Sequence, residues 1–216
     1  LKYTYLMVNF SFNRNKFVAK KLGKLNGEKI LDIGCRDKIF QTYLEGNYKY
    51  TRVDFDPNKP ENINTSEQII NHNLEKGLPA NFEYDIINAL DVLEHVENIH
   101  ELLNDIFLKS KKKISIALPN MGYYKFRINF MLNGVLSGKY IFHEKKVADR
   151  HRWIPNYSTI LKFIESNQHD EWSVKKFDFV AERKRNFLSY YIEKFLSKLF
   201  PSLFVYEVIF IFEKKL

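Results

Sequence analysis

Short apolar runs alternate with helix-like segments along the first 120 residues of the chain. The apolar runs predict buried strands at residues 29–33, 50–55, 69–74, 84–90 and 114–118. Between them, apolar residues at helical spacing predict a short helix at residues 39–46 and a longer helix at 96–109. Apolar strands that alternate with helices are typical of a parallel sheet covered on both faces. The pattern therefore predicts an α/β fold.

Further elements are predicted at the two ends of the chain. An amphipathic helix, placed at about residues 11–26 and ending near Gly27, is expected to cover one edge of the core. After residue 153 the pattern predicts a helix at 157–165, with Asn156 or Ser158 as its cap, a strand at 172–181, a helix at 187–200 and a strand at 203–213. We find no internal repeat or linker, so residues 1–216 are predicted to form a single domain.

Residues 120–153 interrupt the strand–helix rhythm. The segment is long, aromatic and rich in lysine and arginine, with Glu144 and Asp149 as its only acidic residues. Connections of this length inside a compact domain are usually lids or substrate-binding insertions. The segment is therefore predicted to be an insertion or lid, and the alternative is an extra helical hairpin that only packs against the domain.

Composition narrows the class of protein without naming a partner. Hydrophobic residues make up 45% and charged residues 28% of the chain, as in a globular protein. No apolar run approaches the roughly 18–20 residues that span a bilayer, and we recognise no signal peptide, so a cytoplasmic location is expected. The helix at 187–200 carries an apolar stripe, which fits a membrane interface or, as we favour, a helix that covers the core.

Net charge and the single cysteine add two limits. The formal charge of +8 suits an acidic partner, such as nucleic acid or a phosphorylated substrate, but its lysines are mostly dispersed, as on a solvated surface. Cys35 is the only cysteine, which excludes an intramolecular disulfide and fits a reducing compartment. Its place in a turn favours a small residue packed under a nucleotide over a nucleophile. No metal site is predicted, and the sequence does not define the oligomeric state.

Polar residues follow several of the predicted strands. Asp32 and Gly34 end the first strand, where glycine lets the backbone pass close to a ligand. Asp54 ends the second strand, where a carboxylate can accept hydrogen bonds from both hydroxyls of a ribose. Asn73 and Leu74 follow the third strand and are placed to meet an adenine edge. Together these positions predict a nucleotide site at one edge of the sheet.

These motifs resemble those of the class I S-adenosylmethionine-dependent methyltransferases. The resemblance rests on Ile-Leu-Asp-Ile-Gly-Cys at 30–35, on residues 53–56, 73–79 and 84–87, on Asp-Val-Leu-Glu-His at 91–95 and on Leu-Pro-Asn at 118–120. It extends over about residues 29–165, in the branch associated with glycan and small-molecule modification. It implies a doubly wound, mostly parallel seven-stranded sheet with an antiparallel last strand and a helical insertion after the fifth strand.

The resemblance also implies a cofactor, S-adenosylmethionine, and a role for each matching residue. Asp32 and Gly34 would line its methionine portion, Asp54 its ribose, and Asn73 and Leu74 its adenine, while Ala89 and Leu90 would flank its sulfonium. Cys35 and Phe55 are further cofactor-binding candidates. His95 would be the general base for a hydroxyl or, equally, a structural histidine. The insertion would contact the substrate through His143, Arg150, His151 and Arg152, unless its arginines only pair with Glu144 or Asp149.

The chain departs from the family pattern where the first turn continues. Arg36 and Lys38 stand where the pattern has its second and third glycines, and Asn73 replaces the usual aspartate.

The leading prediction is a methyltransferase that acts on oxygen of a small-molecule or saccharide acceptor. The alternatives are a methyltransferase-fold binding protein that has lost its cofactor and, less favoured, a nucleic-acid methyltransferase. An NAD-dependent dehydrogenase is disfavoured because the first turn lacks the Gly-x-Gly-x-x-Gly pattern.

Overall fold

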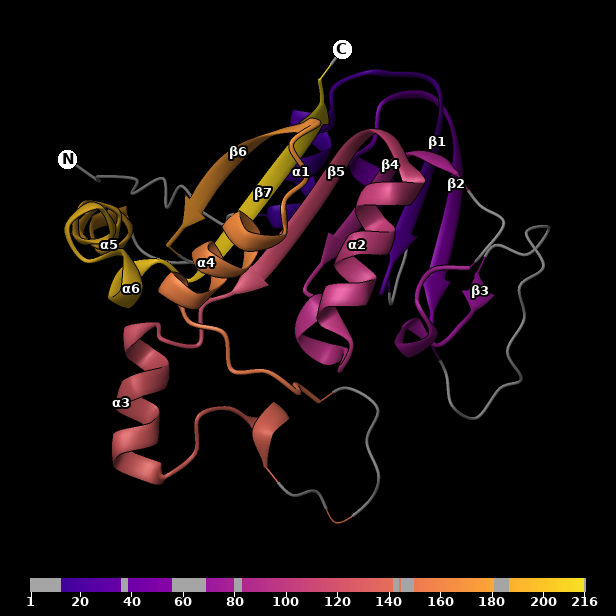
Figure 1. Cartoon of the computed structure of the whole chain (residues 1–216). Helices are drawn as coiled ribbons and strands as arrows, with labels where there is room; N and C mark the ends of the chain where they lie inside the picture. Colours follow the sequence, from indigo (N-terminus) through magenta and orange to yellow (C-terminus); the bar gives the residue numbers. More distant parts are fainter. Residues whose placement is uncertain are drawn as a thin grey trace, which may run out of the picture.

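A computed structural model describes residues 13–35, 39–55, 69–79, 83–141, 144, 150–180 and 187–215. Its centre is a seven-stranded sheet in the order β3-β2-β1-β4-β5-β7-β6 (Figure 1). The strands are β1 (Leu25–Ile33), β2 (Gly46–Asp54), β3 (Ile70–Asn71), β4 (Tyr84–Leu90), β5 (Ser110–Pro119), β6 (Trp172–Phe179) and β7 (Glu207–Lys214). The pairs among β1 to β5 are parallel, whereas β7 is antiparallel to both of its neighbours. The predicted sheet, with its antiparallel last strand, is confirmed.

Helices cover both faces of this sheet. Helix α1 (Arg14–Leu22) lies on one face, and α2 (Ile99–Lys109) and α4 (Tyr157–Asn167) lie on the other (Figure 1). Each face buries its own cluster of apolar side chains, with Phe107 and Phe212 in the larger cluster and Val18 and Phe40 in the smaller. The two clusters explain why β1, β4 and β5 read as continuous apolar runs, since both sides of these strands are buried.

Two predicted helices differ from the structure. The helix predicted at 39–46 is a single 3-10 turn, η1 (Gln41–Tyr43), because Gly46 already begins β2. A side chain at Gly46 would meet the carbonyl oxygen of Leu25 at 2.2 Å, so the strand starts tightly against β1. Helix α1 ends at Leu22 rather than near Gly27, which lies inside β1 at a register shift. The other elements match within a few residues, and Asn156 caps α4 as predicted.

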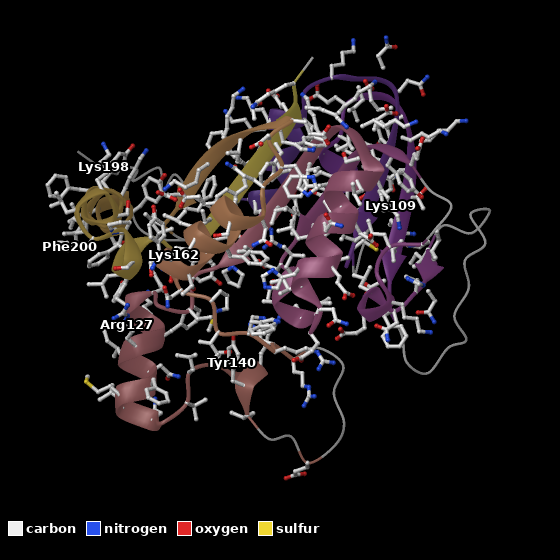
Figure 2. All side chains as sticks on the ribbon, viewed as in Figure 1. Lys109, Arg127, Tyr140, Lys162, Lys198 and Phe200 are labelled. Atoms are coloured by element: carbon white, nitrogen blue, oxygen red, sulfur yellow. The ribbon has the colours of Figure 1, made fainter. Side chains whose placement is uncertain are left out.

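The insertion after β5 lies beyond the carboxyl ends of the strands (Figure 1). It contains α3 (Tyr124–Asn133) and the 3-10 turn η4 (Gly138–Tyr140), and Figure 2 labels Tyr140 on this turn. No residue of α3 is buried. The insertion therefore projects from the edge of the sheet where the sequence predicts the site.

Helix α5 (Phe187–Leu199) and the short α6 (Pro201–Phe204) lie at the side of the sheet near β6 and β7 (Figure 1). The apolar stripe of α5 is exposed at Leu188, Ile192 and Phe195, whereas Glu193 is buried. This helix therefore does not cover the core in the way we favoured from the sequence, since its apolar side chains face outward. Membrane contact through residues 187–200 stays a prediction. Among the described residues no helix is long and apolar enough to cross a bilayer.

Candidate functional site at the carboxyl edge of the sheet

The strand order reverses between β1 and β4, and ligands of open α/β sheets bind at such a switch point. Asp32 lies there on β1, level with Asn88 on β4 and Arg52 on β2. Its carboxylate accepts hydrogen bonds from the Tyr50 hydroxyl at 2.5 Å and the Asn88 amide at 2.6 Å. Asp32 is buried, and these two hydrogen bonds hold its carboxylate against β2 and β4.

Gly34 makes the turn that leaves β1. Its φ is +63°, and a Cβ atom there would lie 2.6 Å from Val92 Cγ2. Both facts require glycine, because other residues rarely adopt this φ and Val92 fills the adjacent space. Next to it, burial raises the pKa of the Cys35 thiol to about 12, and the charges of Asp32 and Asp54 act in the same direction. Cys35 is therefore a protonated thiol at neutral pH, as expected of a packing residue rather than a nucleophile.

The ends of β2 and β3 supply the next group of predicted residues. One Asp54 carboxylate oxygen accepts the Phe55 amide at 2.8 Å, and the Phe55 side chain is exposed. The Asn73 side chain accepts the Glu75 amide at 3.0 Å and so caps η2 (Leu74–Lys76), while Leu74 packs into the core. Arg36 and Lys38, which replace the family glycines, lie outside the described residues, as does His143.

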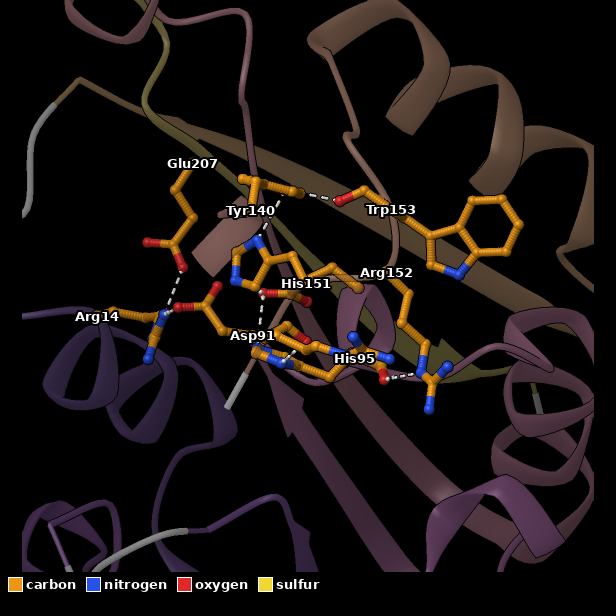
Figure 3. A network of polar contacts seen from close by, with 10 residues as sticks. Arg14, Asp91, His95, Tyr140, His151, Arg152, Trp153 and Glu207 are labelled. Atoms are coloured by element: carbon orange, nitrogen blue, oxygen red, sulfur yellow. Dashed lines mark hydrogen bonds and ion pairs between the residues drawn. The ribbon is translucent and has the colours of Figure 1, made fainter. Parts of the chain in front are cut away.

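The end of β4 forms a second acidic centre. Ala89 and Leu90 are buried, and the chain turns at Asp91, whose φ of 56° is positive. Arg14 of α1 bonds to Asp91 and, at 2.7 Å, to Glu207 at the start of β7 (Figure 3). Burial lowers the pKa of Arg14, but the charges of Glu207 and Asp91 outweigh it, so the guanidinium stays charged. One helix and two strands thus meet at a buried ion pair.

The 3-10 turn η3 (Leu93–His95) brings Glu94 and His95 together with His151 from the insertion. The imidazole rings of His95 and His151 lie 4.5 Å apart, edge to face, and each Nε2 atom lies 3.8 Å from Glu94 Oε1. Glu94 is 1% exposed, and neither of its carboxylate oxygens has a hydrogen-bond partner among the described residues. Burial raises the pKa of Glu94 well above its usual range, and the charge of Asp91 raises it further.

Hydrogen bonds to backbone carbonyls attach residues 150–153 to this turn. The Arg152 amide donates to the Glu94 carbonyl at 2.9 Å, and its guanidinium Nε donates to the His95 carbonyl at 3.0 Å (Figure 3). The Trp153 indole N–H donates to the Val96 carbonyl at 2.7 Å. Arg152 also pairs with Glu75 and Glu97, which the sequence did not suggest.

An open pocket of about 280 Å³ lies beside this attachment. It is lined by residues of η4, of the turn after η3 and of the attached segment: Glu97, Lys139, Tyr140, Ile141, Arg150, His151 and Arg152. Of the four substrate candidates, three line the pocket and His143 is not described. His151 lines the pocket, and its Nε2 atom lies 3.8 Å from Glu94 Oε1. It is therefore the residue that lies between the pocket and the turn after β4.

The strand order and the antiparallel β7 define a Rossmann-like α/β fold of the type found in class I methyltransferases. Residues 11–120 match the family of methyltransferase domains. The chain belongs to this family, the S-adenosylmethionine-dependent methyltransferases, and its cofactor is S-adenosylmethionine. A search of curated proteins found no match.

Solved structures support the fold at low identity. The small RNA methyltransferase HEN1 is 12% identical, with a TM-score of 0.61 over 95% of this chain and 26% of that one. This chain thus spans about a quarter of that protein. Magnesium protoporphyrin IX methyltransferase from Synechocystis PCC 6803, solved with bound S-adenosylhomocysteine, is 13% identical, with a TM-score of 0.52 over 93% and 81% of the two chains. The plantazolicin methyltransferase BpumL with S-adenosylhomocysteine is 16% identical, with a TM-score of 0.52 over 94% and 82%.

Proposed function

We propose that this methyltransferase acts on an oxygen atom of a small-molecule or saccharide acceptor bound beside His95 and His151. The observation that carries the proposal is the pocket next to His151, at the end of β4. Polar side chains and arginines line it, which suits a hydroxylated acceptor with an anionic substituent. Its volume of about 280 Å³ suits a small molecule.

The proposed cofactor site is the edge formed by β1, β2, β3 and β4. Gly34 leaves room for close approach, and the charges of Asp32 and Asp54, which raise the Cys35 pKa, suit a positively charged ligand. In this proposal Asp32, Gly34 and Cys35 contact the methionine portion, Asp54 and Phe55 the ribose, and Asn73 and Leu74 the adenine. Ala89 and Leu90 flank the sulfonium. When bound, S-adenosylmethionine supplies an electrophilic methyl group.

The chain's own contribution to the reaction would be alignment, exclusion of water and removal of a proton. The Nδ1 atom of His95 lies 2.9 Å from the Arg150 carbonyl, an oxygen that can only accept, so neutral His95 carries its proton on Nδ1. Its Nε2 atom then has a lone pair that can take a proton from an acceptor hydroxyl.

Replacing His95 by alanine should lower kcat about 100-fold or more and leave the dissociation constant for S-adenosylhomocysteine nearly unchanged. Equal loss in both would indicate a structural role.

The cofactor site is tested by calorimetric titration of the full chain with S-adenosylhomocysteine. Asp54→Ala should weaken binding by about 1.5–3 kcal/mol for each lost charge-assisted hydrogen bond, or roughly 10-fold to 150-fold. Asp85→Ala is the matched control, because Asp85 is the second residue of β4, at the end opposite the site, and its side chain accepts the Lys29 amide. Equal affinity of the Asp54 variant and the wild type would show that the ribose is placed wrongly.

Two other functions would be indicated by binding measurements, one with S-adenosylhomocysteine and one with nucleic acid. If the chain binds no S-adenosylhomocysteine at millimolar concentration, the proposed cofactor site is wrong and a binding protein of this fold is favoured. If RNA or DNA binds with a steep salt dependence, the +8 charge indicates a nucleic-acid acceptor instead.

A further inference from the structure

We propose that Glu94, His95 and His151 form a binding site for one divalent transition-metal ion, such as Mn²⁺, Co²⁺ or Zn²⁺. The three residues offer two imidazole nitrogens and one carboxylate, all within 4.8 Å of one another. Imidazole and carboxylate together suit divalent ions of this group. The metal-binding step is independent of the proposed function, whereas the role of the ion in methyl transfer rests on it.

The protonation of both histidines supports the site. In neutral His95 the proton is on Nδ1, since this atom donates to the Arg150 carbonyl. The Tyr140 hydroxyl donates its one proton to the Trp153 carbonyl at 2.6 Å, so its oxygen accepts from His151 Nδ1 at 2.8 Å. Both Nε2 atoms therefore carry lone pairs.

These two lone pairs face the Glu94 carboxyl group, which has no proton to donate to them once it is ionised. Each Nε2 atom lies 3.8 Å from Glu94 Oε1, and the glutamate oxygens lack hydrogen-bond partners among the described residues. Within the same described part of the chain, Asp91 Oδ1 is another buried oxygen without such a partner. Burying acceptors without donors is costly, and a cation between them offsets that cost. The charges of Lys139 and Arg14 act on Glu94, but neither side chain donates a hydrogen bond to it.

The spacing is compatible with one ion after a small contraction. Two ligand atoms at about 2.1 Å from a metal lie roughly 3.0–3.4 Å apart. The two 3.8 Å separations from Glu94 Oε1 must therefore shorten by several tenths of an ångström, and the two histidine ligand atoms, which lie within 4.8 Å of each other, must approach to the same range. Figure 3 shows His95 and His151 on separate segments, so such a shift needs only a small movement of the attached insertion. Hydrogen bonds from Nδ1 to a carbonyl and a hydroxyl are the usual outer contacts of metal-bound histidines.

Three protein ligands leave other coordination positions for water or substrate. His151 also lines the 280 Å³ pocket, so an acceptor oxygen bound there could complete the coordination. A metal lowers the pKa of a bound hydroxyl. With the ion present, His95 Nε2 would be a ligand instead of a base, and the ion would supply the Lewis acidity that helps an acceptor hydroxyl lose its proton to solvent.

The experiment is calorimetric titration of the chelator-treated full chain with MnCl₂, CoCl₂ and ZnCl₂, with MgCl₂ for comparison. We expect one ion per chain at micromolar concentration for at least one transition metal. Glu94→Gln and His151→Ala should each weaken binding at least 100-fold. Tyr140→Phe removes the hydroxyl that joins His151 to the Trp153 carbonyl and should weaken binding about 10-fold to 100-fold. His100→Ala is the control, because His100 is exposed on α2 and bonds Asn167 instead.

Glu94→Gln separates metal binding from structural roles. Glutamine keeps the shape of the side chain and cannot become charged, so the metal-free variant should unfold at the same temperature as the wild type or higher. The proposal is overturned if no ion binds with one-to-one stoichiometry, or if Glu94→Gln binds it as tightly as the wild type. S-adenosylhomocysteine binding is measured separately. Metal binding without it would contradict the proposed function alone, and the reverse result would contradict the metal site alone.

Discussion

Gly34 is constrained twice, by its own backbone and by its neighbour Val92. Gly34→Ala should lower the free energy of unfolding by about 1 kcal/mol for the left-handed backbone and by a further ~1–3 kcal/mol for the contact with Val92. Gly134→Ala is a matched control, since Gly134 has a similar φ of +65° but nothing within 4 Å of the position that a methyl group would take. Urea denaturation of both variants measures the difference, and equal losses would show that Val92 moves aside.

Single residues of the site differ in how well the sequence predicts them. The sequence places Asp54, His95 and Gly34 at the edge of the sheet because each follows an apolar run, and the end of such a run marks that edge. The hydrogen bonds of Asp32 to Tyr50 and Asn88 depend on the register of three strands, which a single sequence does not specify. The contact of Glu94 with His151 depends on how the insertion folds back, and the only signal was the basic, aromatic segment that precedes α4.

Asn120 joins the elements that follow β5. Its side chain donates to the Ser202 and Val205 carbonyls at 3.1 and 2.6 Å and accepts the Gly122 and Tyr157 amides at 2.9 and 3.0 Å. One buried side chain thus connects the end of β5 with the start of α4 and with α6.

Asn120→Asp should therefore be destabilising despite its equal size. An ionised carboxylate cannot donate to the two carbonyls, and each lost bond should cost about 1–3 kcal/mol. Asn47→Asp, at an exposed position of β2, should change the unfolding free energy by less than about 0.5 kcal/mol. Thermal unfolding followed by circular dichroism compares the two, and similar midpoints would mean that the side chain at position 120 is not rigidly held.

Elements were predicted best where both faces of a strand are buried. Strand β4 was predicted within its observed bounds because all but one of its residues are buried. The helix at 39–46 was predicted wrongly because Phe40 and Leu44 are at helical spacing, yet both pack from a single turn between two closely spaced strands. The exposed apolar stripe of α5 has the same pattern as a buried one, so the sequence alone could not distinguish the two.

At the scale of the whole molecule, Arg14 ties helix α1 to the end of β4 and the start of β7. Arg14→Ala removes the cation that pairs with Asp91 and Glu207, and Glu207 is buried. Breaking a buried ion pair in this way should cost about 3–5 kcal/mol. Lys20→Ala on the exposed face of α1 is the control. A loss of under about 1 kcal/mol in urea denaturation would mean that the pair behaves as a surface pair.

The position of the two tryptophans has a spectroscopic consequence. Trp172 is buried in the core, whereas Trp153 is 41% exposed and bonds the Val96 carbonyl next to the site. Emission from Trp172 should report only on global unfolding. A change in emission of the folded protein therefore reports on residues 150–153, so that a fluorimeter can follow, in real time and without a label, the attachment of the insertion to the edge of the sheet.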